Sequence, residues 1–141
     1  MNWKLILQLS LFGLIMAFGT VSMIPTTFEP VFWVVIYVLS AYIIAKGCTQ
    51  KYFMNGFMVA IFNCVWITAV HAYFYSAYIK NHPYMSPQKL GLPLSMYTHP
   101  REALIITAPG FAIGCGIVLG LFAFVASKIV KKKNVSAAGV Q

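Results

Sequence analysis

The sequence predicts an all-α membrane protein, a bundle of four transmembrane helices. Of its 141 residues, 60% are hydrophobic and only 9% are charged, whereas a soluble domain carries about a quarter of its residues as charges. The mean hydropathy is +0.80. The charged residues separate four apolar stretches, and a helix needs roughly 20 apolar residues to cross a bilayer. Because these stretches are continuously apolar instead of alternating, helices are favoured over a barrel.

The first two spans are predicted at residues 5–24 and 28–45. The second stretch is short, but Thr26 and Glu29 have the spacing of a capping box, which lets the helix begin near residue 28. Pro30 then falls in the first turn, where its missing N–H costs little. A cleaved signal peptide is the alternative for the first stretch, although the apolar run is longer than the core of an ordinary signal sequence.

The third and fourth spans are predicted at residues 52–79 and 103–127. The third is long enough that it must tilt or protrude. In the fourth, Pro109 is expected to produce a kink or to lie in a late first turn. The connection 80–102 is long and contains four prolines, whereas the earlier connections are short, so the first three helices are expected to pack as antiparallel neighbours.

Basic residues predict the orientation, because Lys and Arg in short loops stay on the cytoplasmic side. With the N-terminus inside, seven basic residues are cytoplasmic and three lie outside. Both termini are therefore expected in the cytoplasm of a bacterium, with the loop between helices 3 and 4 outside the inner membrane. One domain is expected to cover residues 1–130, and residues 131–141 are expected to form a basic, disordered tail. Four lysines are expected to meet anionic lipid and not nucleic acid: Lys128, Lys131, Lys132 and Lys133.

Small residues recur along three of the spans. In lipid, helices associate through close backbone approach and not through the hydrophobic effect. The candidate packing residues are Gly13, Gly56, Ala60, Gly110, Gly114, Gly116 and Gly120. Most of them are expected to pack inside one bundle. The last span has more glycines than a single neighbour requires, so a homo-oligomer through this helix is a second hypothesis.

Polar side chains at membrane depth lie mostly on the third span. Asn63, Thr68 and His71 are the candidate functional residues, because ionisable and polar groups inside a membrane are often functional. At 100° per residue, Cys64, Thr68, His71 and Tyr75 share one stripe that must face protein or a cavity. A neutral His71 that bonds a neighbouring helix is the structural alternative.

The loop between the last two spans contains soft ligands that would suit Cu(I). They are His82, Met85, Met96 and His99. They have no fixed short spacing, so we expect neither a metal nor another cofactor. Cys48 is predicted to be cytoplasmic, while Cys64 and Cys115 lie within helices, and no disulfide is expected.

Two acidic residues leave little material for acid–base catalysis, and motifs such as H-E-x-x-H and G-x-S-x-G are absent. We therefore expect no enzyme, with an intramembrane hydrolase that uses His71 as base as an open alternative. The sequence favours a non-enzymatic accessory or structural membrane component that packs with itself or with another membrane protein. The alternative is a small transporter or channel-like oligomer for a neutral or apolar solute, with the Asn63, Thr68 and His71 side of the third span lining the path.

Overall fold

The computed structural model describes residues 1–130, and all regular secondary structure there is helical. Its elements are α1 (Trp3–Ser22), α2 (Glu29–Gly47), α3 (Tyr52–Tyr73), α4 (Tyr75–Asn81), the 3-10 helices η1 (Pro83–Met85) and η2 (Leu94–Met96), and α5 (Pro100–Ile129). Helices α1, α2, α3 and α5 are long and apolar enough to cross a membrane. The predicted all-α class with four such helices is thus confirmed, and the chain is a small multi-span membrane protein. Lys131, Lys132 and Lys133 lie outside the described residues.

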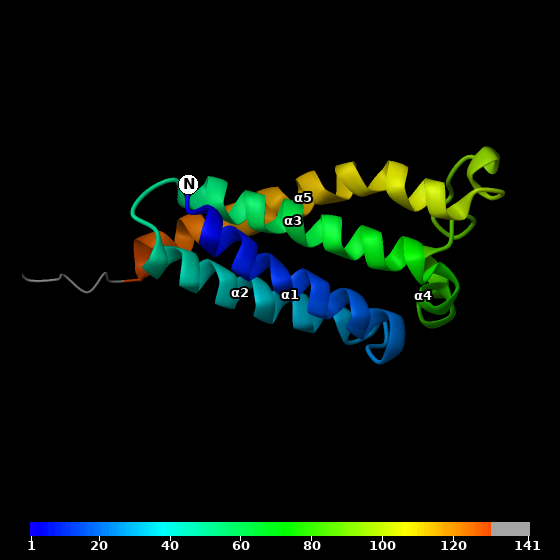
Figure 1. Cartoon of the computed structure of the whole chain (residues 1–141), viewed down its shortest axis with the longest axis horizontal. Coiled ribbons are helices and arrows are strands. Elements are labelled where there is room, and N and C mark those ends of the chain that lie inside the picture. The colour runs from blue at the N-terminus through cyan, green and yellow to red at the C-terminus, as the bar shows by residue number, and fades with distance from the viewer. Residues whose placement is uncertain (131–141) are drawn as a thin grey trace, which may run out of the picture.

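The four long helices run antiparallel along one axis (Figure 1). The largest interface joins α3 to α5; α1 packs on α3, and α2 packs on α5. The expectation that the first three helices are mutual neighbours is therefore only partly right, because α2 touches α1 and α3 slightly. The N-terminus and the last turn of α5 lie at one end of the bundle, and α4 lies at the other (Figure 1).

The third predicted span is divided in two. Helix α3 ends at Tyr73, Phe74 leaves the helical conformation with φ −96° and ψ 33°, and α4 begins at Tyr75. The 22 residues of α3 extend about 33 Å, close to the roughly 30 Å of a hydrocarbon core. The excess length of this segment is thus placed in a separate short helix.

The starts of α2 and α5 differ from the predictions in detail. Phe28 is the N-cap of α2 and makes no capping bond with its side chain. The predicted capping box is therefore wrong, because Thr26 donates its hydroxyl proton to the carbonyl of Asn81 instead. Pro30 does lie in the first turn. Pro109 lies inside α5, in its third turn, because the helix begins at Pro100.

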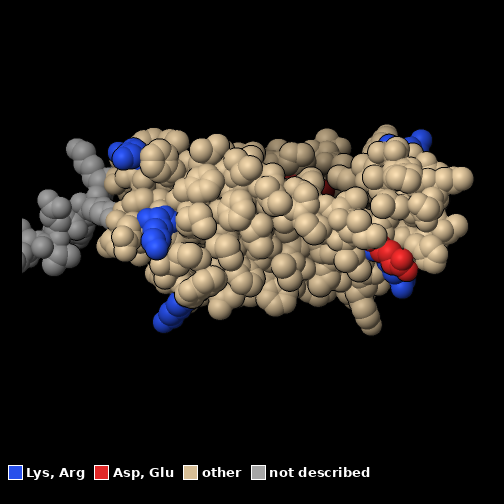
Figure 2. All heavy atoms as spheres, turned by 90° about the horizontal axis from the view of Figure 1, so that it is seen from above, with Lys and Arg blue, Asp and Glu red and all other residues tan. Residues whose placement is uncertain are grey.

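The core consists of small and aliphatic side chains from all four long helices. Its buried members are Ile6, Leu9, Ala41, Ile44, Cys48, Val59, Ala60, Leu119 and Ala123. Large apolar side chains cover the outside as well, which is the pattern of a bundle solvated by lipid. Lys and Arg side chains gather near the two ends of the visible face and leave the belt between them free of basic residues (Figure 2).

Candidate functional site

Three glycines of the α3–α5 interface allow the two backbones to approach closely. A Cβ on Gly56 would lie 2.7 Å from the carbonyl oxygen of Leu119. A Cβ on Gly116 or Gly120 would lie within 2.8 Å of a phenylalanine ring on α3. Ala60 is fully buried beside them. These four predicted packing residues therefore lie inside the bundle.

Asn63 and Gly13 form the corresponding contact between α3 and α1. A Cβ on Gly13 would lie 2.6 Å from the Cα of Asn63, and the N–H of Gly13 donates to Asn63 Oδ1 at 3.2 Å. Asn63 is 2% exposed, and within residues 1–130 its Nδ2 has no hydrogen-bond partner. This asparagine is therefore covered by α1, while Thr68 is half-buried further along the helix.

The remaining two predicted packing glycines face away from the bundle. A Cβ on Gly110 or Gly114 would meet no atom of the described chain within 4 Å. Both residues are exposed, whereas Ala112 and Gly116, which flank Gly114 on the other side of α5, are buried. The structure thus separates the glycines of α5 into an inner pair that the fold uses and an outer pair that it does not.

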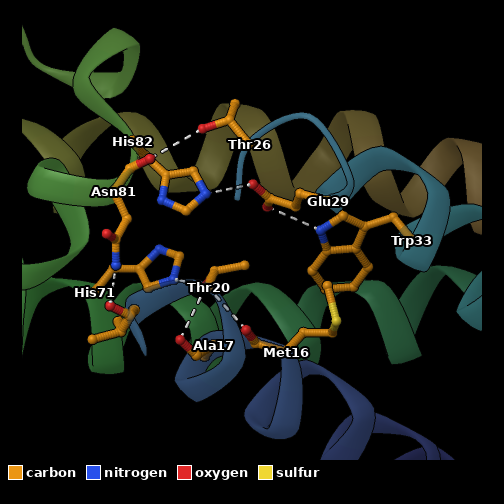
Figure 3. A network of polar contacts seen from close by, with 10 residues as sticks. Met16, Ala17, Thr20, Thr26, Glu29, Trp33, His71, Asn81 and His82 are labelled. Carbon is orange, nitrogen blue, oxygen red and sulfur yellow. Dashed lines mark hydrogen bonds and ion pairs between the residues drawn. The ribbon is translucent and has the colours of Figure 1, made fainter. Parts of the chain in front are cut away.

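A polar cluster lies where α1, α3 and α4 meet, and Figure 3 shows its hydrogen bonds. His71 Nε2 lies 2.8 Å from Thr20 Oγ1, and both residues are buried. Thr20 Oγ1 also lies 3.0 Å from the carbonyl oxygens of Met16 and Ala17. Because a hydroxyl has a single proton to donate, a neutral His71 with its proton on Nε2 satisfies this arrangement.

Three rings are stacked in a column beyond His71. The rings of His71 and Tyr78 are 3.8 Å apart between centroids and inclined by 17°. Tyr78 and His82 are 4.8 Å apart and inclined by 18°. His82 is fully buried, and Tyr78 is 6% exposed. The column therefore ties α3, α4 and the start of the long loop into one packed unit.

A carboxylate faces the far end of this column. Glu29 Oε2 lies 3.1 Å from His82 Nε2, and Glu29 Oε1 accepts a hydrogen bond from Trp33 Nε1 at 3.1 Å (Figure 3). Asn81 adds a link by donating to the carbonyl oxygen of Val21 at 2.7 Å. The first turn of α2 and the end of α1 are thus both fastened to the segment that follows Phe74.

Tyr78, in the middle of the column, is held in its neutral form. Burial raises the pKa of its phenol above the ordinary value, and the negative charges of Glu29 and Tyr75 raise it further. A buried phenol that cannot ionise at physiological pH contributes stacking area and no charge. Tyr78 therefore adds no charge to the contact between Glu29 and His82.

The four predicted soft metal ligands lie in different surroundings. His82 is buried against Glu29, whereas His99 is exposed and its Nδ1 lies 3.3 Å from Glu102 Oε1. Met85 is exposed and Met96 is half-buried. Across the part of the chain that the structure describes, no group of three or more His, Cys, Asp or Glu side chains could hold a metal ion.

Glu29, Tyr78 and His82 belong to this cluster but were not predicted as parts of it from the sequence. A signal for the column was available: His71, Tyr78 and His82 are separated by seven and four residues, the spacing of one helical face. No such signal existed for Glu29, because its contact with His82 joins residues far apart in the sequence. The cluster fastens four helices together: α1, α2, α3 and α4.

No protein-family model, curated protein or solved structure matches this chain.

Proposed function

We propose that this protein is a non-enzymatic accessory or structural component of the membrane that acts by lateral helix association through α5. The observation that supports this proposal is the open pair Gly110 and Gly114, beside which a Cβ would meet no neighbouring atom. In lipid, small residues four positions apart allow a second helix to approach closely and gain dispersion contacts.

The residues around this pair give the surface a suitable shape. Ile106 and Ile117 are 62% and 46% exposed, and at 100° per residue they lie on the same side of α5 as the two glycines. Larger side chains on either side of two glycines leave a shallow depression in the helix surface. The bundle does not need this depression for its own packing, so a second copy or another membrane helix is the proposed occupant.

The transporter hypothesis receives less support from the packing. Its candidate residues Asn63 and His71 lie against Gly13 and Thr20, respectively, and His71 is further covered by Tyr78. Side chains that line a path for a solute would instead face a cavity. Residence in a bacterial inner membrane, with lipids and a membrane protein as partners, belongs to the same proposal.

The test compares Gly114→Leu with Ala69→Leu, a matched change at an exposed position of α3. Labelled protein is reconstituted in liposomes, and its oligomeric state is measured by single-molecule photobleaching over a range of protein-to-lipid ratios. We expect the wild-type chain and Ala69→Leu to associate, and Gly114→Leu to lose about 1–3 kcal/mol of association free energy through overpacking. Equal association of both variants would contradict a contact through these glycines. A monomeric wild type would leave another membrane protein as the partner, to be captured by photocrosslinking from Ile117.

A further inference from the structure

An apolar groove of about 440 Å³ lies between the C-terminal halves of α2 and α5. Its walls include Val38 and Tyr42 on α2, and Leu121, Val125 and Ile129 on α5. These five side chains, which we call the groove residues, are 45% to 73% exposed. The groove is therefore open to the surrounding lipid, and its volume lies within the range of ordinary ligand sites.

The length of the groove indicates what kind of molecule fills it. On α5 its lining extends from Leu121 to Val130, which is about 13 Å along the helix axis. This is close to the hydrocarbon depth of one leaflet, about 15 Å, and less than half of what a membrane-spanning partner helix would cover. An acyl chain that enters from one leaflet fits this length better than a partner helix.

Two lysines lie at the end of the bundle where the groove opens. Lys46 Nζ lies 4.8 Å above the ring of Tyr42, one of the groove residues. Lys128 Nζ lies 5.3 Å above the ring of Phe124, which directly precedes Val125. Long lysine side chains that pack on aromatic rings near helix ends hold their charge at the membrane surface.

No acidic side chain neutralises these two lysines. The chain has two acidic residues, and they lie in the first turns of α2 and α5, as Glu29 and Glu102. Both first turns are at the opposite end of the bundle from Lys46 and Lys128, which are in the last turns of the same helices. The groove thus combines an apolar trough with an uncompensated pair of positive charges at its mouth.

We propose that this groove binds an anionic phospholipid from the leaflet at the lysine-rich end, with one acyl chain along the groove residues and the headgroup phosphate at Lys46 and Lys128. Basic pockets between transmembrane helices are known to recognise anionic headgroups in this way. The site is on the opposite half of α5 from Gly110 and Gly114, so it does not depend on lateral association of the protein.

Native mass spectrometry of the full chain in a neutral detergent tests the headgroup contact. Phosphatidylglycerol and phosphatidylcholine with identical acyl chains are titrated separately. We expect tighter binding of phosphatidylglycerol, and a loss of about fivefold in its affinity for each of Lys46→Gln and Lys128→Gln. Lys89→Gln, in the long loop at the other end, is the matched control and should bind as the wild type. Equal affinity for the two lipids, or lysine variants that keep the wild-type affinity, would overturn the proposal.

A second pair of variants tests the acyl-chain contact. Val38→Trp places a large ring in the groove, whereas Val34→Trp adds the same ring one turn earlier on α2, at a position that is 57% exposed and does not line the groove. We expect only Val38→Trp to weaken the binding of both phospholipids. Circular dichroism and thermal unfolding without added lipid establish that each variant is folded. Unchanged lipid binding by a folded Val38→Trp protein would place the lipid elsewhere.

Discussion

Two glutamate–histidine pairs in one chain allow a comparison of the same contact in two environments. Glu29 and His82 are 18% and 0% exposed, whereas Glu102 and His99 are 70% and 64% exposed. An exposed ion pair contributes about 0–1 kcal/mol because water screens it. A buried one contributes little in net terms, yet removal of one partner leaves the other without compensation. The two pairs should therefore respond very differently to the same substitution.

His82→Phe is expected to destabilise the fold by about 1–3 kcal/mol, because Glu29 loses the group it faces while an aromatic ring remains against Tyr78. His99→Phe, the matched control, should change stability by less than about 0.5 kcal/mol. Reversible unfolding in mixed micelles with increasing denaturing detergent would measure both changes in stability. Equal effects of the two substitutions would mean that the buried pair does not fasten α2 to the segment after α4.

Tyr78 should make the protein sensitive to alkali. Burial raises the pKa of its phenol in the folded state, so its contribution to stability is complete below the unfolded-state value of about 10 and is lost as the pH rises above it. In Tyr78→Phe this part of the alkaline loss should disappear. Thermal unfolding in detergent from neutral to strongly alkaline pH measures this loss of stability. The control is Tyr84→Phe, because Tyr84 is an exposed tyrosine of η1. Parallel pH profiles for all three proteins would contradict this assignment.

The sequence indicated unusual single residues but not the contacts that they make. The sequence identified Asn63 and His71 as unusual, and both are buried polar residues. It placed Glu29 in a cap and His82 in an outer loop, because the contact between them depends on the chain turning at Phe74. A contact between residues so far apart in the sequence is not encoded in local spacing.

At the scale of elements, the apolar stretches predicted the existence of the helices but not all their neighbours. Short connections determine that consecutive helices run antiparallel, but they do not determine which face of each helix is buried. The glycines of α3 and α5 select these two helices as the central pair. Helix α2 has large exposed apolar residues such as Val31, Val35 and Leu39 and few small ones, so its sequence gave no comparable indication of its partner.

The inner and outer glycines should differ in their tolerance of one added methyl group. Gly56→Ala brings a Cβ against the backbone carbonyl of Leu119, and we expect it to destabilise the bundle by about 1–3 kcal/mol. Gly114→Ala meets open space and should be neutral or stabilise the helix by up to about 1 kcal/mol. The stability of both variants is compared by titration with a denaturing detergent. The protein is diluted until it is monomeric. If Gly56→Ala left the stability unchanged, this result would contradict close packing of α3 on α5.

The arrangement of charge over the whole molecule predicts its orientation. Lys46 and Lys128 lie at one end, and Glu29 and Glu102 lie at the other, in helices that share the same polarity. Under the rule that basic residues stay in the cytoplasm, we expect the lysine-rich end to face inward. The fold itself is consistent with both termini on one side, because α1 begins and α5 ends at the same end of the bundle (Figure 1).

Thiol labelling with a membrane-impermeant maleimide tests this orientation. Cys48 is only 5% exposed, so we use the exposed positions Gln50 and Gln88 in the variants Gln50→Cys and Gln88→Cys. In intact cells we expect labelling at residue 88 only, and in opened cells at both. The unsubstituted chain is the control, because any label that it takes up is on its native cysteines. Labelling of residue 50 from outside would reverse the assigned orientation.

The partnership of α2 with α5 has a consequence for biosynthesis. Helix α2 is the second span to be made, yet its main partner is the last. While α3, α4 and the long loop are synthesised, α2 has only slight contacts with the helices already in the membrane. Insertion of the spans and assembly of the bundle are therefore separate stages, and assembly can finish only after the final turn of α5 has emerged from the ribosome. In a chain that stops at Asn81, α2 would be in the membrane without its main partner, α5.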